Sequence, residues 1–236
     1  MTKGDSHASA QLRTNGKDVI ERIFGSWGAG GILTELRGVT DGVYLVGGSV
    51  RDFILASPPS DLDLIVPNGQ PLVDMILARY GVCKVNRHGN RHYRLGNGLK
   101  IDVIEPRNFY RPFQSANDVL SFFDTSVNAI GVNIATGHLL DPLDGSHDLA
   151  SGVVRLPQAR WTSMNAFESV HLLLRLCRLL ERHDLHVIDT ARAEAIVPLV
   201  WEVDWSDLAR LHGLSRSAAA RRIDQTILQR SAVPSY

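Results

Sequence analysis

The part of the chain before Trp161 alternates between two hydrophobic periods. Apolar residues at helical spacing predict one or two short helices over residues 17–38. The compact β-branched run VYLVGG then predicts a buried strand ending in two glycines, and VRDFIL predicts the first turns of a helix. Further along, the pattern predicts a second strand in SPPSDLDLIV, a helix in PLVDMILARYG, and hairpins in HYRLGNGLKIDVIEP and NAIGVNIATGHLLDPLDG.

The last third of the chain, from Trp161 onward, has a helical pattern throughout. FESVHLLLRLCRLLERH places leucines on one broad face with arginines between them, which is typical of an amphipathic helix. TARAEAIVPLV, SDLARLHGL and SRSAAARRIDQTILQR continue the helical pattern. The pattern therefore predicts a mixed α and β part over about 39–155 and an all-helical part over about 160–232.

Composition narrows the class of protein. Twenty-five Lys and Arg balance twenty-five Asp and Glu, so the chain is not basic as a whole. Any contact with nucleic acid must therefore be confined to a local basic patch. The two cysteines, Cys83 and Cys177, fit no metal spacing and no disulfide framework, which favours a reducing cytoplasm. No apolar run approaches the roughly 20 residues of a membrane helix. The polar start, 1–16, lacks the apolar core of a secretory signal, and we expect a flexible lead-in there.

The DLD segment contains the first candidate for chemistry. If Asp61 and Asp63 both lie in a strand, they point to the same face, because side chains alternate with a period of two. Neighbouring carboxylates repel each other unless a cation lies between them, and Mg²⁺ prefers oxygen ligands. The alternative is that one Asp ends the turn after the prolines while the other faces water.

Three further segments add candidates around this pair. Gly47 and Gly48 end a strand and open a helix, where backbone N–H groups can hold a phosphate or simply serve a turn. Arg51 lies one turn into that helix, where it is placed either to contact a triphosphate or to form a salt bridge with Asp52 or Asp61. Asp102 lies in the apolar strand LKIDVIE, where a charged group needs a partner such as a metal unless the position is exposed.

In this combination the sequence resembles the class II nucleotidyltransferases, namely the tRNA CCA-adding enzymes and bacterial poly(A) polymerases. GGSVRD followed by DLD is similar to their head-domain signature, and Asp102 falls where they place a third carboxylate. DTSVNAIGVNIATGHLLDPLDGSHDL resembles the family's next conserved stretch, and FESVHLLLRLCRLLERHDLHVIDTARAEAI resembles its base-recognition helix and neck. The resemblance runs from about Tyr44 to Ile196.

The resemblance implies an α+β fold in which a small mixed, largely antiparallel sheet flanked by helices precedes an all-helical neck. It places the head domain at 17–158 and the neck-like domain at 159–236. It also implies Mg²⁺-dependent transfer of a nucleoside monophosphate from ATP or CTP to an acceptor hydroxyl, with Asp61 and Asp63 holding the metal and Asp102 activating the hydroxyl. The nucleotide-binding residues that it implies are Gly47, Gly48, Arg51, Asp124, Asn128, Arg175 and Arg178.

The chain departs from the family pattern at two places. Phe122 and Phe123 stand where the family usually has two arginines. In the base-recognition helix, Ser169 and Leu172 replace an Asp and an Arg that hydrogen-bond the base edges of ATP or CTP. Arg175 and Arg178 remain on one side of this helix, as nucleotide contacts or as a solvated surface. The resemblance therefore predicts a retained metal site beside an altered nucleotide-selection site.

The sequence says less about the molecule that accepts the nucleoside monophosphate. The family binds tRNA through a tail domain that we do not find, so we expect an RNA acceptor that is bound weakly, through the head and through Arg216, Arg221 and Arg222. A homo-oligomer in which a second subunit supplies the missing surface is the exception. The alternatives that stay open are transfer to a small-molecule or protein hydroxyl, and a non-catalytic regulatory relative whose C-terminal helices resemble a helix-turn-helix.

Overall fold

The computed structural model describes residues 16–39, 42–86, 89–188 and 190–228. The chain forms two compact units, which are treated separately below. The first comprises the residues up to Phe123 together with Val127–Ala150, and the second comprises Asp124–Ser126 and the residues from Ser151 onward. The lead-in predicted over 1–16 lies outside the described residues except for Gly16, which begins the first described helix.

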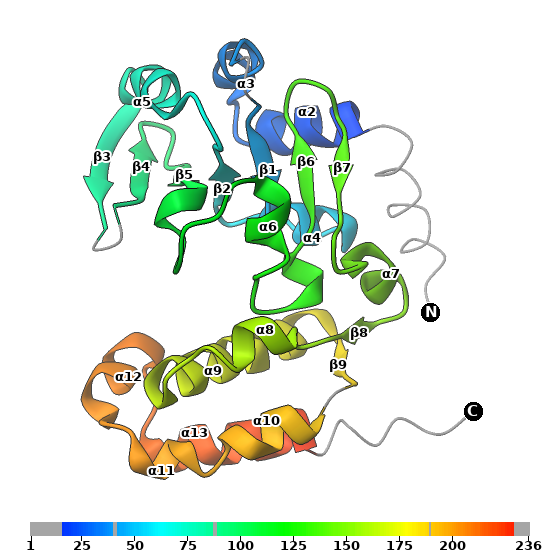
Figure 1. Ribbon diagram of the computed structural model, residues 1–236, viewed down its shortest axis with the longest axis vertical. Helices are drawn as coiled ribbons and strands as arrows, with labels where there is room; N and C mark the ends of the chain where they lie inside the picture. The colour runs from blue at the N-terminus through cyan, green and yellow to red at the C-terminus, as the bar shows by residue number, and fades with distance from the viewer. Residues whose placement is uncertain (1–15, 40–41, 87–88, 189, 229–236) are drawn as a thin grey trace. The chain divides into compact units, whose positions relative to one another are not determined.

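The first unit, the N-terminal α+β unit, is built on a seven-stranded sheet of order β3-β4-β5-β2-β1-β6-β7 (Figure 1). Its described strands are β1 (Tyr44–Val46), β2 (Leu62–Ile65), β3 (Gly81–Val85), β4 (Arg91–Leu95), β5 (Lys100–Ile104), β6 (Gly131–Asn133) and β7 (Leu139–Leu140). Its described helices are α2 (Gly16–Ser26), α3 (Gly30–Leu36), α4 (Gly48–Ile54), α5 (Gln70–Ala78), α6 (Ala116–Leu120) and α7 (Gly145–Ala150), with short 3₁₀ turns η1 (Pro106–Asn108) and η2 (Ser126–Asn128).

The sheet is mixed and mostly antiparallel, as predicted. Only β2 and β5 pair in parallel, and the other neighbouring strands in the described sheet are antiparallel. Both predicted hairpins are present, as β4–β5 and β6–β7. The edge strand β3 was not predicted, because most of its side chains are exposed and it lacks the apolar alternation of a half-buried strand.

The two faces of the sheet are covered differently. One face is buried over the central strands β1, β2 and β5, where its side chains are Leu45, Leu62, Leu64, Ile101 and Val103. On the other face, α6 packs only over the centre of the sheet, where Val119 and Leu120 meet Val46 and Ile65 (Figure 1). A capping box fixes the start of α6. The Ser115 side chain accepts a hydrogen bond from the backbone N–H of Asp118, and the Asp118 side chain accepts one from the backbone N–H of Ser115.

The second unit, called the helical unit below, contains the long helix α9 (Ala166–His183). Its other described elements are α8 (Gln158–Trp161), α10 (Thr190–Ile196), α11 (Leu199–Glu202), α12 (Trp205–His212), α13 (Arg216–Ile223), the π-helical turn η3 (Asp224–Leu228) and the parallel strands β8 (Val153–Val154) and β9 (His186–Val187). Asn165 and Glu168 form a capping box at the start of α9. Burial inside this unit raises the pKa of Cys177 to about 12, so this cysteine is an inert packing residue.

None of the helices in the described ranges is long and apolar enough to cross a membrane.

Candidate active site

The turn between β1 and α4 brings the backbone against Asp63. Gly47 has a φ of 74°, a conformation that glycine adopts at little cost. A Cβ atom at this position would lie 3.2 Å from Asp63 Oδ2. Any larger residue would therefore combine backbone strain with a close contact, so Gly47 is required both by the turn and by the carboxylate beside it.

Two of the three predicted carboxylates lie side by side. Asp63 on β2 and Asp102 on β5 are partners in the parallel register, and partners in register point to the same face of a sheet. Neighbouring strands are about 4.8 Å apart, which is close enough for two carboxylates to share a cation. Asp61 differs from the prediction: β2 begins at Leu62, and Asp61 lies just before it, where its Oδ1 accepts a hydrogen bond of 2.8 Å from Ser60.

Sequence reasoning did not identify His92 as a site residue. Its Nδ1 is paired with Asp102 Oδ1, and the two side chains are 41% and 43% exposed, so this part of the site is open to solvent. The signal was available in the sequence. Counting outward from the glycine turn of the β4–β5 hairpin places residue 92 opposite residue 102, and the register agrees.

The Arg51 guanidinium is held by two neighbours. Its Nε donates to Asp52 Oδ1 at 2.8 Å, and its Nη1 donates to Asn128 Oδ1 at 2.5 Å. The arginine also lies against Gly48, because a Cβ there would be 3.3 Å from Nη2. The structure thus contains the salt bridge to Asp52 that was the alternative for Arg51, and it joins three predicted nucleotide-binding residues, Gly48, Arg51 and Asn128, in one cluster.

The two phenylalanines that depart from the family pattern form an aromatic wall. Phe123 Cε2 would be 3.7 Å from a Cβ on Gly47, so this ring borders the turn that holds Asp63. Phe123 packs against Phe109 with ring centroids 5.6 Å apart, and Phe122 is buried beneath the guanidinium of Arg111. The wall is apolar where the family usually has two positive charges.

The remaining predicted residues belong to the helical unit. Asp124 accepts a hydrogen bond of 2.6 Å from Trp161 Nε1 through its main-chain oxygen. Arg175 and Arg178 are both exposed on α9, and partial burial together with the charges of Arg175 and Arg222 lowers the pKa of Arg178. Ser169 and Leu172 are each only 5% exposed, so neither presents a free surface to a base.

Two of the arginines expected to bind RNA are occupied within the helical unit. Arg222 forms a two-point ion pair with Glu181 on α9, and its Nε lies 2.9 Å from Glu181 Oε1. Arg216 donates to the main-chain oxygen of Val203 at 2.7 Å. The expectation that these two side chains serve as free phosphate contacts is therefore not supported, whereas Arg221 is exposed.

The donor set of the N-terminal unit suits a hard divalent cation. Mg²⁺ is usually held by one or two carboxylates, with waters and substrate phosphates completing its shell. Asp63 and Asp102 supply two carboxylates on one face, and Asp61 lies two residues from Asp63. Among the described residues, no three ligating side chains of His, Cys, Asp or Glu converge. The residues therefore fit a magnesium ion that a bound triphosphate helps to hold.

Residues 43–155 match the family described as the poly A polymerase head domain. The match lies almost entirely in the first α+β unit, which is called the head domain below, and the predicted resemblance to this family is confirmed.

Two curated relatives match about half of this chain, and a solved structure has a similar fold over most of it. The CC-adding tRNA nucleotidyltransferase of Geobacter sulfurreducens is 36% identical over 48% of this chain and 26% of its own length. The A-adding tRNA nucleotidyltransferase of Halalkalibacterium halodurans is 29% identical over 48% of this chain and 30% of its own length. The Thermotoga maritima CCA-adding enzyme, solved in complex with tRNA, has a similar fold, with a TM-score of 0.67 and 21% identity over 90% of this chain and 54% of that one. The chain thus spans about half, or less, of the length of these relatives.

Proposed function

We propose that this chain is a Mg²⁺-dependent nucleotidyltransferase that moves a nucleoside monophosphate from ATP or CTP to the 3′-hydroxyl of a tRNA-like RNA. The observation that carries the proposal is the pair of carboxylates, Asp63 and Asp102, in register on neighbouring strands beside the Gly47 turn. They lie in a domain of the poly A polymerase head family.

The reaction that this site supports is a displacement at the α-phosphorus of the triphosphate. The acceptor oxygen forms a bond to that phosphorus while the bond to the β-phosphate oxygen breaks, and pyrophosphate leaves. Because His92 engages Asp102 Oδ1, we assign Oδ2 of Asp102 as the atom that accepts the hydroxyl proton. Bound magnesium would neutralise charge on the phosphate and leaving oxygens, with Asp61 and Asp63 as its protein ligands.

The neighbouring side chains would position the nucleotide. Gly47 and Gly48 leave room for phosphates beside Asp63, where any side chain would intrude. Arg51 is fixed by Asp52 and Asn128, so its remaining N–H groups are oriented before a nucleotide arrives. Asp124, Arg175 and Arg178 stay proposed nucleotide contacts on the resemblance alone.

The names of the relatives favour tRNA as the acceptor class. One is a CC-adding and the other an A-adding tRNA nucleotidyltransferase, so the same kind of head domain serves both CTP and ATP. We expect RNA binding by this chain to be no tighter than about micromolar at physiological salt, because two of the three candidate arginines are engaged inside the helical unit.

The test supplies labelled ATP or CTP and Mg²⁺ with tRNA transcripts that end before the CCA, after the first C or after the second C. We expect label in RNA, lengthened by one or more nucleotides, and no product with EDTA or with Asp63→Asn. The proposal fails if the wild-type protein labels no transcript. Label on a protein or a small molecule instead would support the alternative acceptor classes.

A further inference from the structure

On one part of the head-domain sheet, outer-face side chains of the described strands are exposed. Strand register places Lys84, His92, Asp102 and Asp63 in one row across β3, β4, β5 and β2. Two residues along, Arg94 and Lys100 form part of a second row on the same face. The outer face of the β3–β4–β5 part of the sheet is therefore continuous with the catalytic carboxylates.

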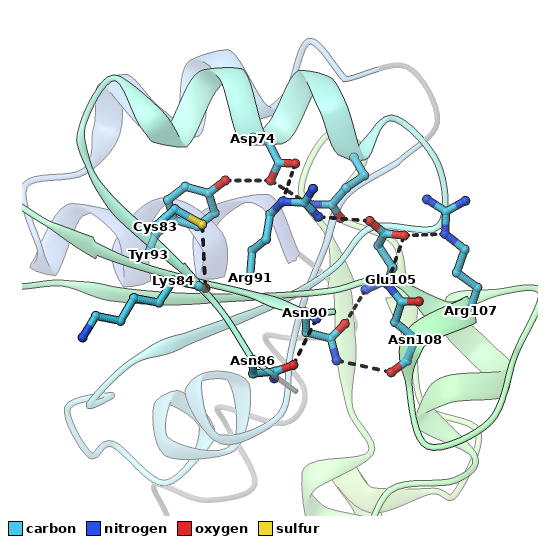
Figure 2. Close-up of polar contacts among 11 residues, drawn as sticks. Asp74, Cys83, Lys84, Asn86, Asn90, Arg91, Tyr93, Glu105, Arg107 and Asn108 are labelled. Atoms are coloured by element: carbon cyan, nitrogen blue, oxygen red, sulfur yellow. Dashed lines mark hydrogen bonds and ion pairs between the residues drawn. The ribbon is translucent and has the colours of Figure 1, made fainter. Parts of the chain in front are cut away.

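The opposite face of these strands is tied to α5. Tyr93 is 2% exposed, and its hydroxyl donates to Asp74 Oδ1 on α5 at 2.6 Å. Arg91 is paired with the same carboxylate, at 2.8 Å from Nε to Oδ2, and with Glu105. Figure 2 shows Lys84 pointing away from Asp74 and Tyr93. The polar groups of this buried face are thus satisfied, whereas the outer face is left to solvent.

The outer face is strongly basic. Lys84, Arg94 and Lys100 are all exposed and are called the basic strip below. On the described strands β3, β4 and β5, the only acid that shares this face is Asp102. No ion pair in the described part of the chain involves a strip side chain, whereas Arg91 on the opposite face has two carboxylate partners. In a chain of zero net charge, this is a local concentration of available positive charge.

The order of the strands assigns the two substrates to opposite sides of the carboxylates. Gly47 follows β1 and borders Asp63, whereas the strip begins at β5 and continues to β3. Neighbouring strands are about 4.8 Å apart, so the strip extends about 10 Å from Asp102. In an in-line displacement, the attacking hydroxyl approaches the phosphorus from the side opposite the leaving group. With the triphosphate beside Gly47, the acceptor approaches from the strip.

We propose that the basic strip binds the phosphodiester backbone of the acceptor RNA next to its 3′ end. This inference rests on the proposed function, whose acceptor it places. Val82 is the register partner of Arg94 and is 67% exposed. It therefore offers an apolar surface to a sugar or base of the RNA. The strip differs from the C-terminal arginines considered earlier, because its charges are not used for internal pairing.

The experiment compares the triple variant Lys84→Ala, Arg94→Ala and Lys100→Ala with a control that loses the same charge elsewhere on the first unit. The control variant is Lys17→Ala, Arg22→Ala and Arg79→Ala, on α2 and just after α5. Binding of a fluorescent single-stranded RNA is measured by anisotropy at several salt concentrations without nucleotide or Mg²⁺. Melting temperatures and the Kd for ATP are measured alongside.

We expect the strip variant to bind RNA at least about tenfold more weakly at 0.1 M salt, with ATP binding and melting temperature unchanged. Its slope of log K against log salt should fall by about 2, since each phosphate contact on a single strand contributes about 0.7. The control should retain the wild-type slope. Because binding is measured without transfer, a failed transfer assay would reject the proposed function without being confused with this result.

Three outcomes would overturn the inference. One is a strip variant with the wild-type affinity and slope, and another is a control variant that weakens RNA binding as much as the strip variant does. The third is a loss of ATP binding with RNA binding intact, which would assign the strip to the triphosphate.

Discussion

The head domain and the helical unit use their polar residues in opposite ways. In the head domain, Asp63 and Asp102 are brought together on one face, although two like charges in register oppose folding. In the helical unit, polar groups are paired with each other: Arg222 with Glu181, and His171 with His212. The first arrangement costs stability and serves the chemistry that we propose, whereas the second serves the packing of the unit itself.

The departures from the family pattern lie in both units. The head domain has the carboxylates and the Gly47 turn of the pattern, but Phe122 and Phe123 stand where the family usually has two arginines. In the helical unit, the positions that resemble the family's base-reading residues are occupied by Ser169 and Leu172, both buried. The proposed metal site therefore follows the pattern more closely than the proposed nucleotide-selection site does.

The largest expected effect is on the carboxylate pair. Asp63→Asn should lower the transfer rate at least about 10³-fold, because it removes a charged metal ligand without changing the packing volume. Without Mg²⁺, the melting temperature should stay the same or rise, since the repulsion between Asp63 and Asp102 is relieved. Single-turnover transfer and thermal melting measure the two effects.

The matched control for this variant removes an acid from the helical unit. Asp207 is exposed, and its ion pair among the described residues is with Arg210 at 2.8 Å, so Asp207→Asn should leave the transfer rate unchanged. Wild-type turnover by Asp63→Asn would contradict the metal-site assignment. Equal losses of transfer rate in the two variants would show that the effect of Asp63→Asn is not specific to the proposed metal site.

A smaller effect is expected in the choice of base. Two base-edge contacts are missing at Ser169 and Leu172, and each is worth about 1–3 kcal/mol in a desolvated site. The ratio of kcat/KM for ATP and CTP on one acceptor should therefore stay below about a hundredfold. Measurement of all four nucleotides under the same conditions checks this. A ratio above a hundredfold would mean that other residues read the base.

The sequence predicted the parts of the fold whose signal is local. The apolar run before Gly47, the glycine turn between β4 and β5 and the leucine face of α9 each lie within about 20 residues, and the structure has all three elements. The parallel pairing of β2 with β5 could not be predicted from local patterns, because it joins segments almost 40 residues apart. The edge strand β3 was missed because exposed strands carry little hydrophobic pattern.

The same limit applies to the candidate site. The motif identified the carboxylates, but not that Asp61 lies just outside β2. His92 became visible only when register was considered, and the pairing of Arg222 with Glu181, 41 residues away, has no local signature. Residue types therefore indicated a candidate chemistry, whereas the partners that hold or occupy each group depend on tertiary contacts.

The ion pair between Arg222 and Glu181 offers a stability test within the helical unit. Both side chains are about two-thirds buried, at 28% and 35% exposed, and Thr226 also donates to Glu181. Glu181→Gln should lower the free energy of unfolding by about 1–2 kcal/mol, because it leaves a partly buried guanidinium without its charged partner. Asp207→Asn, in a pair that is 78% and 63% exposed, should cost less than about 0.5 kcal/mol. Denaturation followed by tryptophan fluorescence measures both, and equal costs would contradict the special role of the Arg222 pair.

The smallest expected effect is a loss of stability in acid that originates in the helical unit. Burial, together with the charges of Arg178, His171, Arg222 and Arg175, lowers the pKa of His212 to about 4. His171, whose Nδ1 lies 3.0 Å from His212 Nε2, has a pKa that is also lowered, chiefly by burial. The unfolded chain therefore binds more protons than the folded protein between about pH 6.5 and pH 4.

It follows that this contribution is fully present above about pH 6.5 and is lost as the pH falls toward 4. Because the ring is only partly buried, solvent screening reduces the expected loss between pH 7.5 and pH 5 to about 1 kcal/mol. His212→Gln keeps a neutral hydrogen-bonding group and should flatten this dependence, whereas His147→Gln at an exposed position should not. Denaturant unfolding at the two pH values decides the matter: a wild-type pH dependence in His212→Gln would place the acid sensitivity outside the His171–His212 pair.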